Sequence, residues 1–398
     1  MQFMNRNLLL KSWYIFVIVM GINTITACSE KYPIEEVAQE TNVLKYTTTQ
    51  ADTRSLSEIL ELAGLSRRNT RSQSLPEAIM PVVDHSDTVA YIVNYANSEG
   101  FVIISTNKKV EPLLAYSDTG SFSLDNEMAK CYFVDKIKSY SDNVHPMDAD
   151  LKESFAAASL DTIHYKYEPV IKKSLGQWSP YNKVVEKYYP GCPAGCGPVA
   201  AAMIMSYCKP SLLMDNCVYQ FSWINEALIV GPEYNGIKDP GIIPNVINIS
   251  RPTSWIMNYN GAVSAISQLL YDIGKRMKAR YTPKSTDAYL SDARAAIISA
   301  GYDVSSITSF DTDNMIDNMK NGYLYYQHGM RTSDKGHFWV IDGFEYDCLD
   351  NGEKVNCYFY CHWGWDGSCD GYYRSDMFKP LADYHYSAGN NFYVRIEE

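Results

Sequence analysis

The chain of 398 residues has no excess of positive charge, no repeated or low-complexity segment and, beyond its N-terminal stretch, no apolar run of membrane-spanning length. Its 35 lysines and arginines stand against 46 acidic residues, which gives a formal net charge of −11. Nucleic acids and anionic membrane surfaces are bound through basic patches, so neither is expected as the main partner. The length predicts two domains with sizeable cores.

Histidine is scarce. The chain has seven, and only His328, His337, His362 and His385 follow the domain boundary that we place in the polar, irregular stretch Thr162–Lys173. A nucleophilic side chain needs a base to take its proton, and histidine most often serves. Few residues can therefore fill that role if the chain is an enzyme.

The N-terminus has the layout of an export signal. Arg6 and Lys11 precede an apolar run over 13–22, and small residues lead to Cys28. These small residues resemble a bacterial lipobox, in which the signal is removed and the cysteine is lipidated, whereas an uncleaved anchor and a simple secretory peptide are the alternatives. We expect residues 1–28 to be a lipoprotein signal peptide. The protein would then be exported and tethered by lipid to the outer membrane or cell surface, or released after processing.

Residues 29–166 are predicted to form a polar tether, to about Thr53, and a small α+β domain. Helical spacing predicts helices, and β-branched and aromatic runs around a Gly-containing turn predict antiparallel strands. The expected helices cover 55–65 and 127–140, and the expected strands cover 89–95, 101–105 and 111–116.

The remaining chain, 167–398, changes from helical to strand patterns. Helices are predicted over 196–207, 263–277 and 288–300, and strands over 323–327, 337–344, 356–363, 371–374 and 392–396. Helices followed by an antiparallel sheet predict an α+β domain in two lobes.

A turn rich in glycine and proline delivers Cys196 to the start of the first of these helices. The dipole and unpaired N–H groups of a helix start favour thiolate over thiol, which makes such a cysteine a better nucleophile. Ordinary packing is the alternative, because cysteine is among the most buried residue types.

His337 is the candidate base. It opens the strand pattern Gly336–Gly343, in which alternation sends His337, Trp339 and Ile341 to one face. It follows Cys196 by about 140 positions, within the spacing of papain-like enzymes. A structural histidine at a strand start is the alternative.

Four motifs in this order resemble the streptopain-like cysteine peptidases, papain-fold enzymes made as zymogens. They are Gln177…Pro180-Tyr181-Asn182, Ala194-Gly195-Cys196 with Ala200 and Ala202, Gly336-His337…Val340-Ile341-Asp342-Gly343, and Trp363-Gly364-Trp365…Gly367…Asp370-Gly371. Upstream, the segments 91–94, 100–105 and 114–118 look like the propeptide of that family. The resemblance covers nearly everything after the tether.

The resemblance implies a two-lobed papain-like domain, with a helical lobe followed by a sheet lobe, behind an α+β prodomain. Cys196 would be the nucleophile and His337 the general base. Gln177 would donate its amide to the oxyanion hole, and Trp363 would shield the site from water. No cofactor and no metal are implied.

His362 departs from the family pattern, which usually has asparagine before Trp-Gly-Trp to hold the catalytic imidazole. A neutral His362 could accept that hydrogen bond, giving a triad Cys196-His337-His362. A protonated His362 would repel an imidazolium at His337 and make activity fall more steeply below about pH 6.5.

The other cysteines allow several pairings. Cys348 and Cys357 flank the hairpin signal Asn351-Gly352 and could form a disulfide, while Cys361 and Cys369 flank the Trp-Gly-Trp loop, but connectivity is not readable from sequence. Zinc is disfavoured, because Cys-x₃-Cys pairs fit its usual spacing poorly. The zinc alternative would use Cys192, Cys196, Cys357, Cys361 and His362.

These observations predict a cysteine endopeptidase that cleaves protein or peptide substrates through an acyl-enzyme. It would be a zymogen with an inhibitory prodomain within 29–166 and a peptidase domain over 167–398, activated by proteolysis. One alternative is a catalytically impaired surface lipoprotein of the same fold that acts as a binding protein. Another is a thiol-dependent transferase or amidase.

Overall fold

The computed structural model describes residues 53–66, 75–84, 87–123, 137, 162–215, 217–234, 258–332, 335–378 and 388–397. These residues belong to one compact unit, 48–398. The predicted signal peptide with Cys28, almost all of the tether, and the helix expected over 127–140, apart from Ile137, lie outside the described residues. Within the described part of the chain, no helix has the length and apolar character needed to span a bilayer.

The N-terminal elements form one helix and an antiparallel run of strands. They are α1 (Leu56–Ser66), β1 (Pro76–Asp84), β2 (Asp87–Tyr95), β3 (Phe101–Ser105) and β4 (Leu113–Ser117), with the short 3₁₀ helix η2 (Ala96–Ser98) in the β2–β3 turn. The predicted hairpin, third strand and first helix are confirmed, whereas β1 was missed. Gly100 closes the hairpin at a positive φ of 102°, where a Cβ would overlap the Ser117 carbonyl oxygen.

The next part of the chain is helical. It contains α4 (Lys183–Tyr188), α5 (Cys196–Cys208), α6 (Phe221–Val230), α7 (Tyr259–Arg276) and α8 (Leu290–Ser299), with the hairpins β6–β7 (Ser211–Met214, Cys217–Gln220) and β8–β9 (Arg280–Tyr281, Thr286–Asp287). Helix α5 is the centre, because all its residues except Tyr207 are buried. The predicted helices over 196–207, 263–277 and 288–300 are confirmed as α5, α7 and α8.

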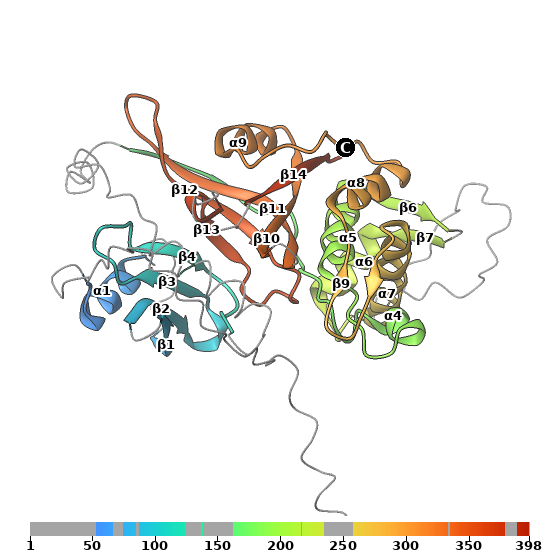
Figure 1. Cartoon of the computed structure of the whole chain (residues 1–398), viewed down its shortest axis with the longest axis horizontal. Coiled ribbons are helices and arrows are strands. Elements are labelled where there is room, and N and C mark those ends of the chain that lie inside the picture. The colour runs from blue at the N-terminus through green and yellow to red at the C-terminus, as the bar shows by residue number, and fades with distance from the viewer. Residues whose placement is uncertain are drawn as a thin grey trace, which may run out of the picture. The chain divides into compact units, whose positions relative to one another are not determined.

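The last part of the chain supplies the sheet. Its elements are α9 (Thr312–Lys320), β10 (Tyr323–Thr332), β11 (Lys335–Cys348), β12 (Lys354–His362), β13 (Gly371–Arg374), η3 (Ser375–Phe378) and β14 (Ala388–Arg395). The strand order β1-β2-β3-β4-β13-β12-β11-β10-β14 makes one antiparallel sheet with the N-terminal strands. In Figure 1 the helices α4 to α8 gather beside β10 and β11. The α+β class with a helical lobe and a sheet lobe is confirmed.

The two faces of β11 contact different cores, as its alternation predicts. Phe338 and Val340 pack with α5 and the other helices. Trp339 and Ile341 pack on the opposite face, in a core that also contains Trp363 and Trp365. Alternation along one strand therefore separates Phe338 from its neighbour His337.

The expectation of an irregular boundary at 162–173 is wrong in its first half. Ile163–Tyr167 forms strand β5, which pairs with residues 344–348 of β11, beyond residues 335–341 of β11 that pair with β10. Tyr165 stacks on Tyr346 and Tyr167 on Phe344, with ring centroids 5.1 and 5.5 Å apart. The period-2 pattern of aromatic residues in this short stretch is a strand signal hidden among polar residues.

The possible disulfides are not formed. Cys348 and Cys357 do lie on the two arms of a hairpin, but Cys348 stands opposite Lys354, and both cysteines are free. Cys361 and Cys369 are free and buried.

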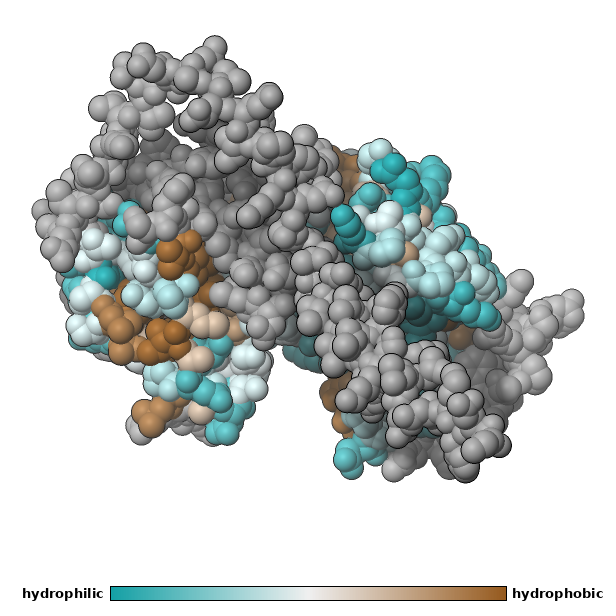
Figure 2. Space-filling model, turned by 60° about the horizontal axis from the view of Figure 1, so that its bottom comes forward, coloured by the Kyte–Doolittle hydropathy of each residue, from teal (hydrophilic) through white to brown (hydrophobic). Residues whose placement is uncertain are grey.

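Figure 2 shows apolar surface on the side of α1 and β1–β4, where Leu75, Ile79 and Val83 are exposed.

Candidate active site

Cys196 is the first residue of α5, as predicted. Gly195 precedes it with φ of 94°, and a Cβ there would lie 2.7 Å from the Thr286 side chain. Two hydroxyl groups fix the turn: Thr286 donates to the Pro193 carbonyl at 2.9 Å, and Tyr326 donates to the Gly197 carbonyl at 3.0 Å. The sulfur is therefore held at a helix start by contacts on both sides.

The Cys196 thiol is neutral in this state. Its residue is only 7% exposed, and burial raises the pKa of the thiol to about 11, although the backbone N–H groups of Phe338 and Gly197 oppose that shift. Helix position favours the thiolate, but removal from water outweighs it here.

Gln177 lies next to the cysteine loop. Its carbonyl accepts a hydrogen bond from the Ala194 N–H at 2.7 Å, so the two loops are joined. The side chain is buried, and among the described residues its amide nitrogen Nε2 has no hydrogen-bond partner. A buried amide donor that is not used is costly unless a ligand atom takes it.

His337 lies among aromatic rings. Its centroid is 4.9 Å from that of Trp365 and 6.2 Å from those of Trp339 and Trp363. The ring Nε2–H donates to the Trp363 carbonyl oxygen at 2.9 Å. Burial lowers the pKa of His337 to about 4, although this carbonyl opposes the shift and His328 adds to it. The ring is neutral at physiological pH.

The structure thus contains Cys196 and His337, the two residues predicted to be nucleophile and base, in their uncharged forms. Cys196 belongs to the helical core, while His337 lies with the tryptophans on the other face of β11. A thiol with a pKa of about 11 and an imidazole with a pKa of about 4 do not form a thiolate–imidazolium pair.

His362 has a different environment from the one expected. Its Nε2 contacts Asp342 Oδ1 at 2.9 Å, and its Nδ1 contacts Ser174 Oγ at 2.8 Å and Asp370 Oδ2 at 3.3 Å. Burial of the ring opposes a charge, but Asp342 and then Asp370 outweigh it and raise the pKa of His362 to about 10. The neutral His362 that would accept a hydrogen bond from His337 is therefore not what the structure contains.

Trp363 is fully buried, and its ring stacks on Trp339 with centroids 5.0 Å apart. The structure brings its backbone, rather than only its indole ring, to His337. Sequence reasoning quoted Asp342 and Asp370 as motif positions but gave them no role, and it gave none to Ser174. The signal in the sequence that could have indicated these contacts is the presence of Asp342 and Asp370 in the same motifs as His362, which stands where asparagine is usual.

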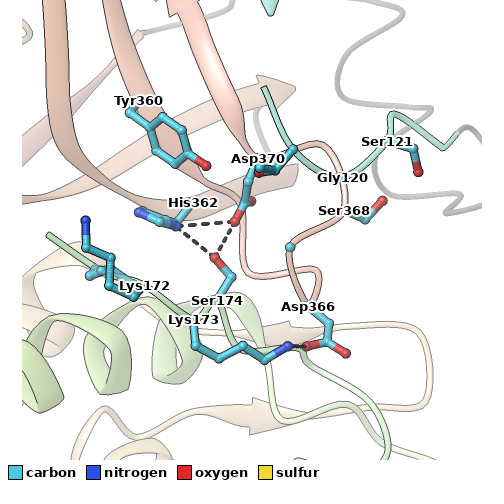
Figure 3. A pocket seen from close by; sticks show the side chains of 13 residues that line it. Gly120, Ser121, Lys172, Lys173, Ser174, Tyr360, His362, Asp366, Ser368 and Asp370 are labelled. Atoms are coloured by element: carbon cyan, nitrogen blue, oxygen red, sulfur yellow. Dashed lines mark hydrogen bonds and ion pairs between the residues drawn. The ribbon is translucent and has the colours of Figure 1, made fainter. Parts of the chain in front are cut away.

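A cavity of about 440 Å³ opens beside His362. Figure 3 shows that Ser174, Asp370 and His362 form a triangle of contacts at one wall, while Lys173 pairs with Asp366 at 2.9 Å on another. Residues 119–121 also line it, and the Ser121 carbonyl accepts from the Cys369 N–H at 3.3 Å. The N-terminal elements thus contact the loop that carries Asp370.

A cysteine at a helix start, a buried histidine on the neighbouring sheet and an unused amide donor are the parts of a cysteine peptidase. Comparison with known proteins gives the particular family. The Peptidase C10 family model matches residues 175–373, half of the sequence, and the chain belongs to this family. It is a cysteine peptidase, a hydrolase of proteins or peptides. A model described as the Spi protease inhibitor matches residues 44–143, so a prodomain precedes the peptidase domain.

The chain is also similar to named proteins and to solved structures. Streptopain of Streptococcus pyogenes serotype M28 is 28% identical over 330 residues, covering 73% of this chain and 75% of the relative, and streptopain of serotype M1 has the same values. A solved fragment of Prevotella intermedia prointerpain A is 19% identical with a TM-score of 0.48, covering 80% of this chain and 99% of that one. For active interpain A the values are 19%, 0.37, 58% and 95%.

Proposed function

We propose that this chain is a cysteine endopeptidase made as an exported zymogen, with Cys196 as nucleophile and His337 as general base. The observation that carries the proposal is the fixed position of Cys196 at the start of α5, next to the buried and unused amide of Gln177. Membership of a peptidase family and the presence of a prodomain support the same proposal.

The reaction follows from these groups. The Cys196 thiolate adds to the carbonyl carbon of the peptide bond, and the oxyanion that forms accepts hydrogen bonds from Gln177 Nε2–H and the Cys196 backbone N–H. The C–N bond then breaks, and His337 gives its proton to the leaving amine. Water attacks the resulting thioester with His337 as base, which releases the acid and restores the thiol.

His337 is prepared for this role by its hydrogen bond. Because Nε2–H donates to the Trp363 carbonyl, the neutral ring carries its basic lone pair on Nδ1. Trp363, stacked among the other tryptophans, would keep water from that ring. The ion pair requires His337 to approach Cys196, which we assign to release of the prodomain.

We place the signal peptide at 1–28, the tether and prodomain within 29–166, and the peptidase domain at 167–398. Strand β5 supports one refinement of this division. It pairs with β11 of the peptidase through five residues, so Ile163–Lys166 would stay with the peptidase after processing. Activation cleavage is then expected before Ile163. Lipidation of Cys28 would tether the exported zymogen to a membrane.

The test is active-site labelling of the processed protein with a peptide that carries a thiol-reactive electrophile. Stoichiometric modification at Cys196, its loss in Cys196→Ala and His337→Ala, and hydrolysis of casein by the wild type would support the endopeptidase. Labelling without hydrolysis would point to a transferase or amidase. N-terminal sequencing of the active form would locate the cleavage, and full activity of the intact chain would contradict the zymogen.

A second candidate is a binding protein of the same fold, favoured by the neutral states of Cys196 and His337. It predicts that the processed chain is neither labelled nor active, while it still binds peptides.

A further inference from the structure

A group of four polar side chains is buried on the far side of the Trp363 backbone from His337. Asp342 comes from β11, His362 from the end of β12, Asp370 from the loop before β13, and Ser174 from the segment before α4. All four are between 0 and 6% exposed. Four groups from four separate segments therefore meet at one largely buried point, which borders the cavity beside His362.

Every hydrogen-bonding group of the His362 ring is used in this group. The ring spans the distance between two carboxylates, with Asp342 at one nitrogen and Asp370 at the other. The Ser174 hydroxyl bridges the second side, because it contacts Nδ1 and donates to Asp370 Oδ2. Figure 3 shows this bridge. An asparagine side chain could not donate in two opposite directions and would leave one carboxylate without its partner.

The group connects directly to the base through Trp363. Asp370 Oδ1 accepts the Trp363 N–H at 2.9 Å, and the carbonyl of the same residue accepts the His337 Nε2–H at 2.9 Å. Asp342 also accepts the Ile171 N–H at 2.7 Å, which ties down the chain segment that carries Ser174. A continuous series of hydrogen bonds therefore leads from the His362 ring through Asp370 and the Trp363 backbone to the His337 ring.

We propose that Asp342, His362 and Asp370 form a positioning triad, which through the backbone of Trp363 sets the tautomer and place of the His337 ring. This inference rests on the proposed role of His337 as base. The link from the three residues to His337 runs through Trp363, so their role is to position the base. Buried ionic groups are a weak source of stability, and fixing one arrangement is their best-attested use.

Charge supports this assignment. Two carboxylates face one imidazolium, whose pKa is raised to about 10. Other titratable groups also face the triad. They are Tyr360, whose ring lies 4.9 Å from the His362 ring, Tyr207 near Asp342, Cys361, Cys369, Tyr372 and Tyr373 near the carboxylates, and Lys172, Lys173 and Asp366 around the cavity. No cluster of acidic, histidine and cysteine residues suited to a metal ion occurs within the described part of the chain. The proton on His362 is what joins the carboxylates.

The prodomain contact lies beside the triad. Cys369 precedes Asp370, and its N–H donates to Ser121 of the prodomain, whose neighbouring residues line the same cavity. Loss of the prodomain removes that contact from the loop that holds the Trp363 N–H. The triad is therefore expected to keep Trp363 in place when the prodomain leaves.

The test uses the full chain with ring-¹⁵N-labelled histidine in a Cys196→Ala background, which needs no activity. In the parent, the His362 nitrogens should show imidazolium shifts at pH 8 and His337 a single neutral Nε2–H form. Asp370→Asn and His362→Asn should convert His337 to a mixture of tautomers. Asp366→Asn, on the same cavity but half-exposed, is the matched control and should leave both rings unchanged.

The second readout is the pH profile of kcat/KM for the processed enzyme with Cys196 intact. Misplacing a catalytic group by about 1 Å costs on the order of 10²-fold, and we expect a loss of this order for Asp370→Asn with a shifted acid limb. Ser174→Ala, which keeps all three charges, should show a smaller change in the same direction and serves if the charge variants do not fold. An unchanged His337 tautomer in folded Asp370→Asn, His362→Asn or Ser174→Ala would overturn the triad. An inactive wild type with the expected ring shifts would overturn the proposed function alone.

Discussion

At the scale of single residues, the state of the active site depends on burial. The Cys196 sulfur is in the place that favours a thiolate, and His337 has the hydrogen bond that orients a base, yet both are uncharged. Helix dipole effects are worth about 0.3–1 kcal/mol, whereas one pKa unit is about 1.4 kcal/mol. Desolvation of this size easily overrides the helix, so Cys196 and His337 are both in the charge state opposite to the one that the proposed mechanism needs.

This charge state predicts the reactivity of Cys196. In the intact chain, iodoacetamide should alkylate Cys196 slowly at pH 7 and faster only as the pH approaches about 11. After processing, the ion pair should give fast alkylation at pH 6 that is lost in His337→Ala. The rate is followed by mass spectrometry of the peptide containing Cys196. Equal rates at pH 6 before and after processing would contradict a thiol that is neutral only in the intact chain.

Gln177 gives a second prediction at this scale. Gln177→Ala removes the unused amide donor and should lower kcat by about 10²–10³ with little change in KM, as for other oxyanion donors. Trp178→Phe, next in sequence and 51% exposed, is the control and should keep near-normal kcat. Steady-state kinetics on a peptide substrate decides this. A rise in KM at unchanged kcat would assign Gln177 to substrate binding instead.

The residues of the site were predictable to different degrees. Cys196, His337, Gln177 and Trp363 followed from motifs that the sequence displays in order. The contacts of His362 did not, because Asp342 lies 20 positions away and its proximity depends on pairing between β11 and β12. The charge of a buried histidine depends on such partners, which a linear pattern does not contain.

At the scale of elements, the sequence predicts helices and strands correctly where the apolar spacing is regular over many residues. It fails where a segment becomes a strand only by pairing with a distant strand. Helices α5, α7 and α8 and the hairpin β2–β3 have regular apolar spacing, and their types were predicted correctly. Strand β5 has five residues, four of them exposed, and is a strand because β11 extends far enough to pair with it. Nothing local reveals the length of that partner.

The pairing of β4 with β13 predicts how a substitution at this contact would change docking of the prodomain. A Cβ on Gly371 would lie 2.5 Å from the Tyr116 carbonyl, 3.1 Å from Ser117 and 3.2 Å from Phe101, all in the prodomain. Gly371→Ala should therefore weaken prodomain docking and speed activation of the intact chain, while kcat/KM of the processed enzyme stays normal. The rate of processing is measured by gel electrophoresis.

Gly352→Ala in the β11–β12 turn is the control. Gly352 has a positive φ, but a Cβ added there would have no atom within 4 Å, so this variant tests backbone strain without a steric clash. It should leave the processing rate unchanged. A Gly371→Ala chain that is processed at the wild-type rate would show that this contact does not hold the prodomain.

At the scale of the whole molecule, three histidines make stability depend on pH in opposite directions. The pKa of His337 and of His328 is lowered to about 4, by burial in both cases, so their contributions to stability are present above pH 6.5 and lost as the pH falls toward 4. The pKa of His362 is raised to about 10, so its contribution is present below pH 6.5 and lost as the pH rises through 10.

The free energy of unfolding of the Cys196→Ala chain should therefore fall on both sides of neutral pH. For His337 the acid loss is on the order of 3 kcal/mol at about 1.4 kcal/mol per pKa unit. His337→Gln should flatten the acid side and His362→Asn the alkaline side in urea unfolding at pH 5, 7 and 9. His164→Gln, on the exposed strand β5, is the control. An unaltered acid slope in His337→Gln would show that this ring does not titrate on unfolding.

The sheet that runs unbroken from β1 to β14 has one more consequence, for colloidal behaviour after processing. While β4 is paired with β13, the outer backbone groups of β13 are partly covered. If processing removes β4 as proposed, they would form a free edge that can template strand addition. Strand β13 is only four residues long and ends in Arg374, and short strands with charge are how proteins keep such edges from self-association. A peptidase domain released from its prodomain would therefore carry its own protection against aggregation at the edge that the release exposes.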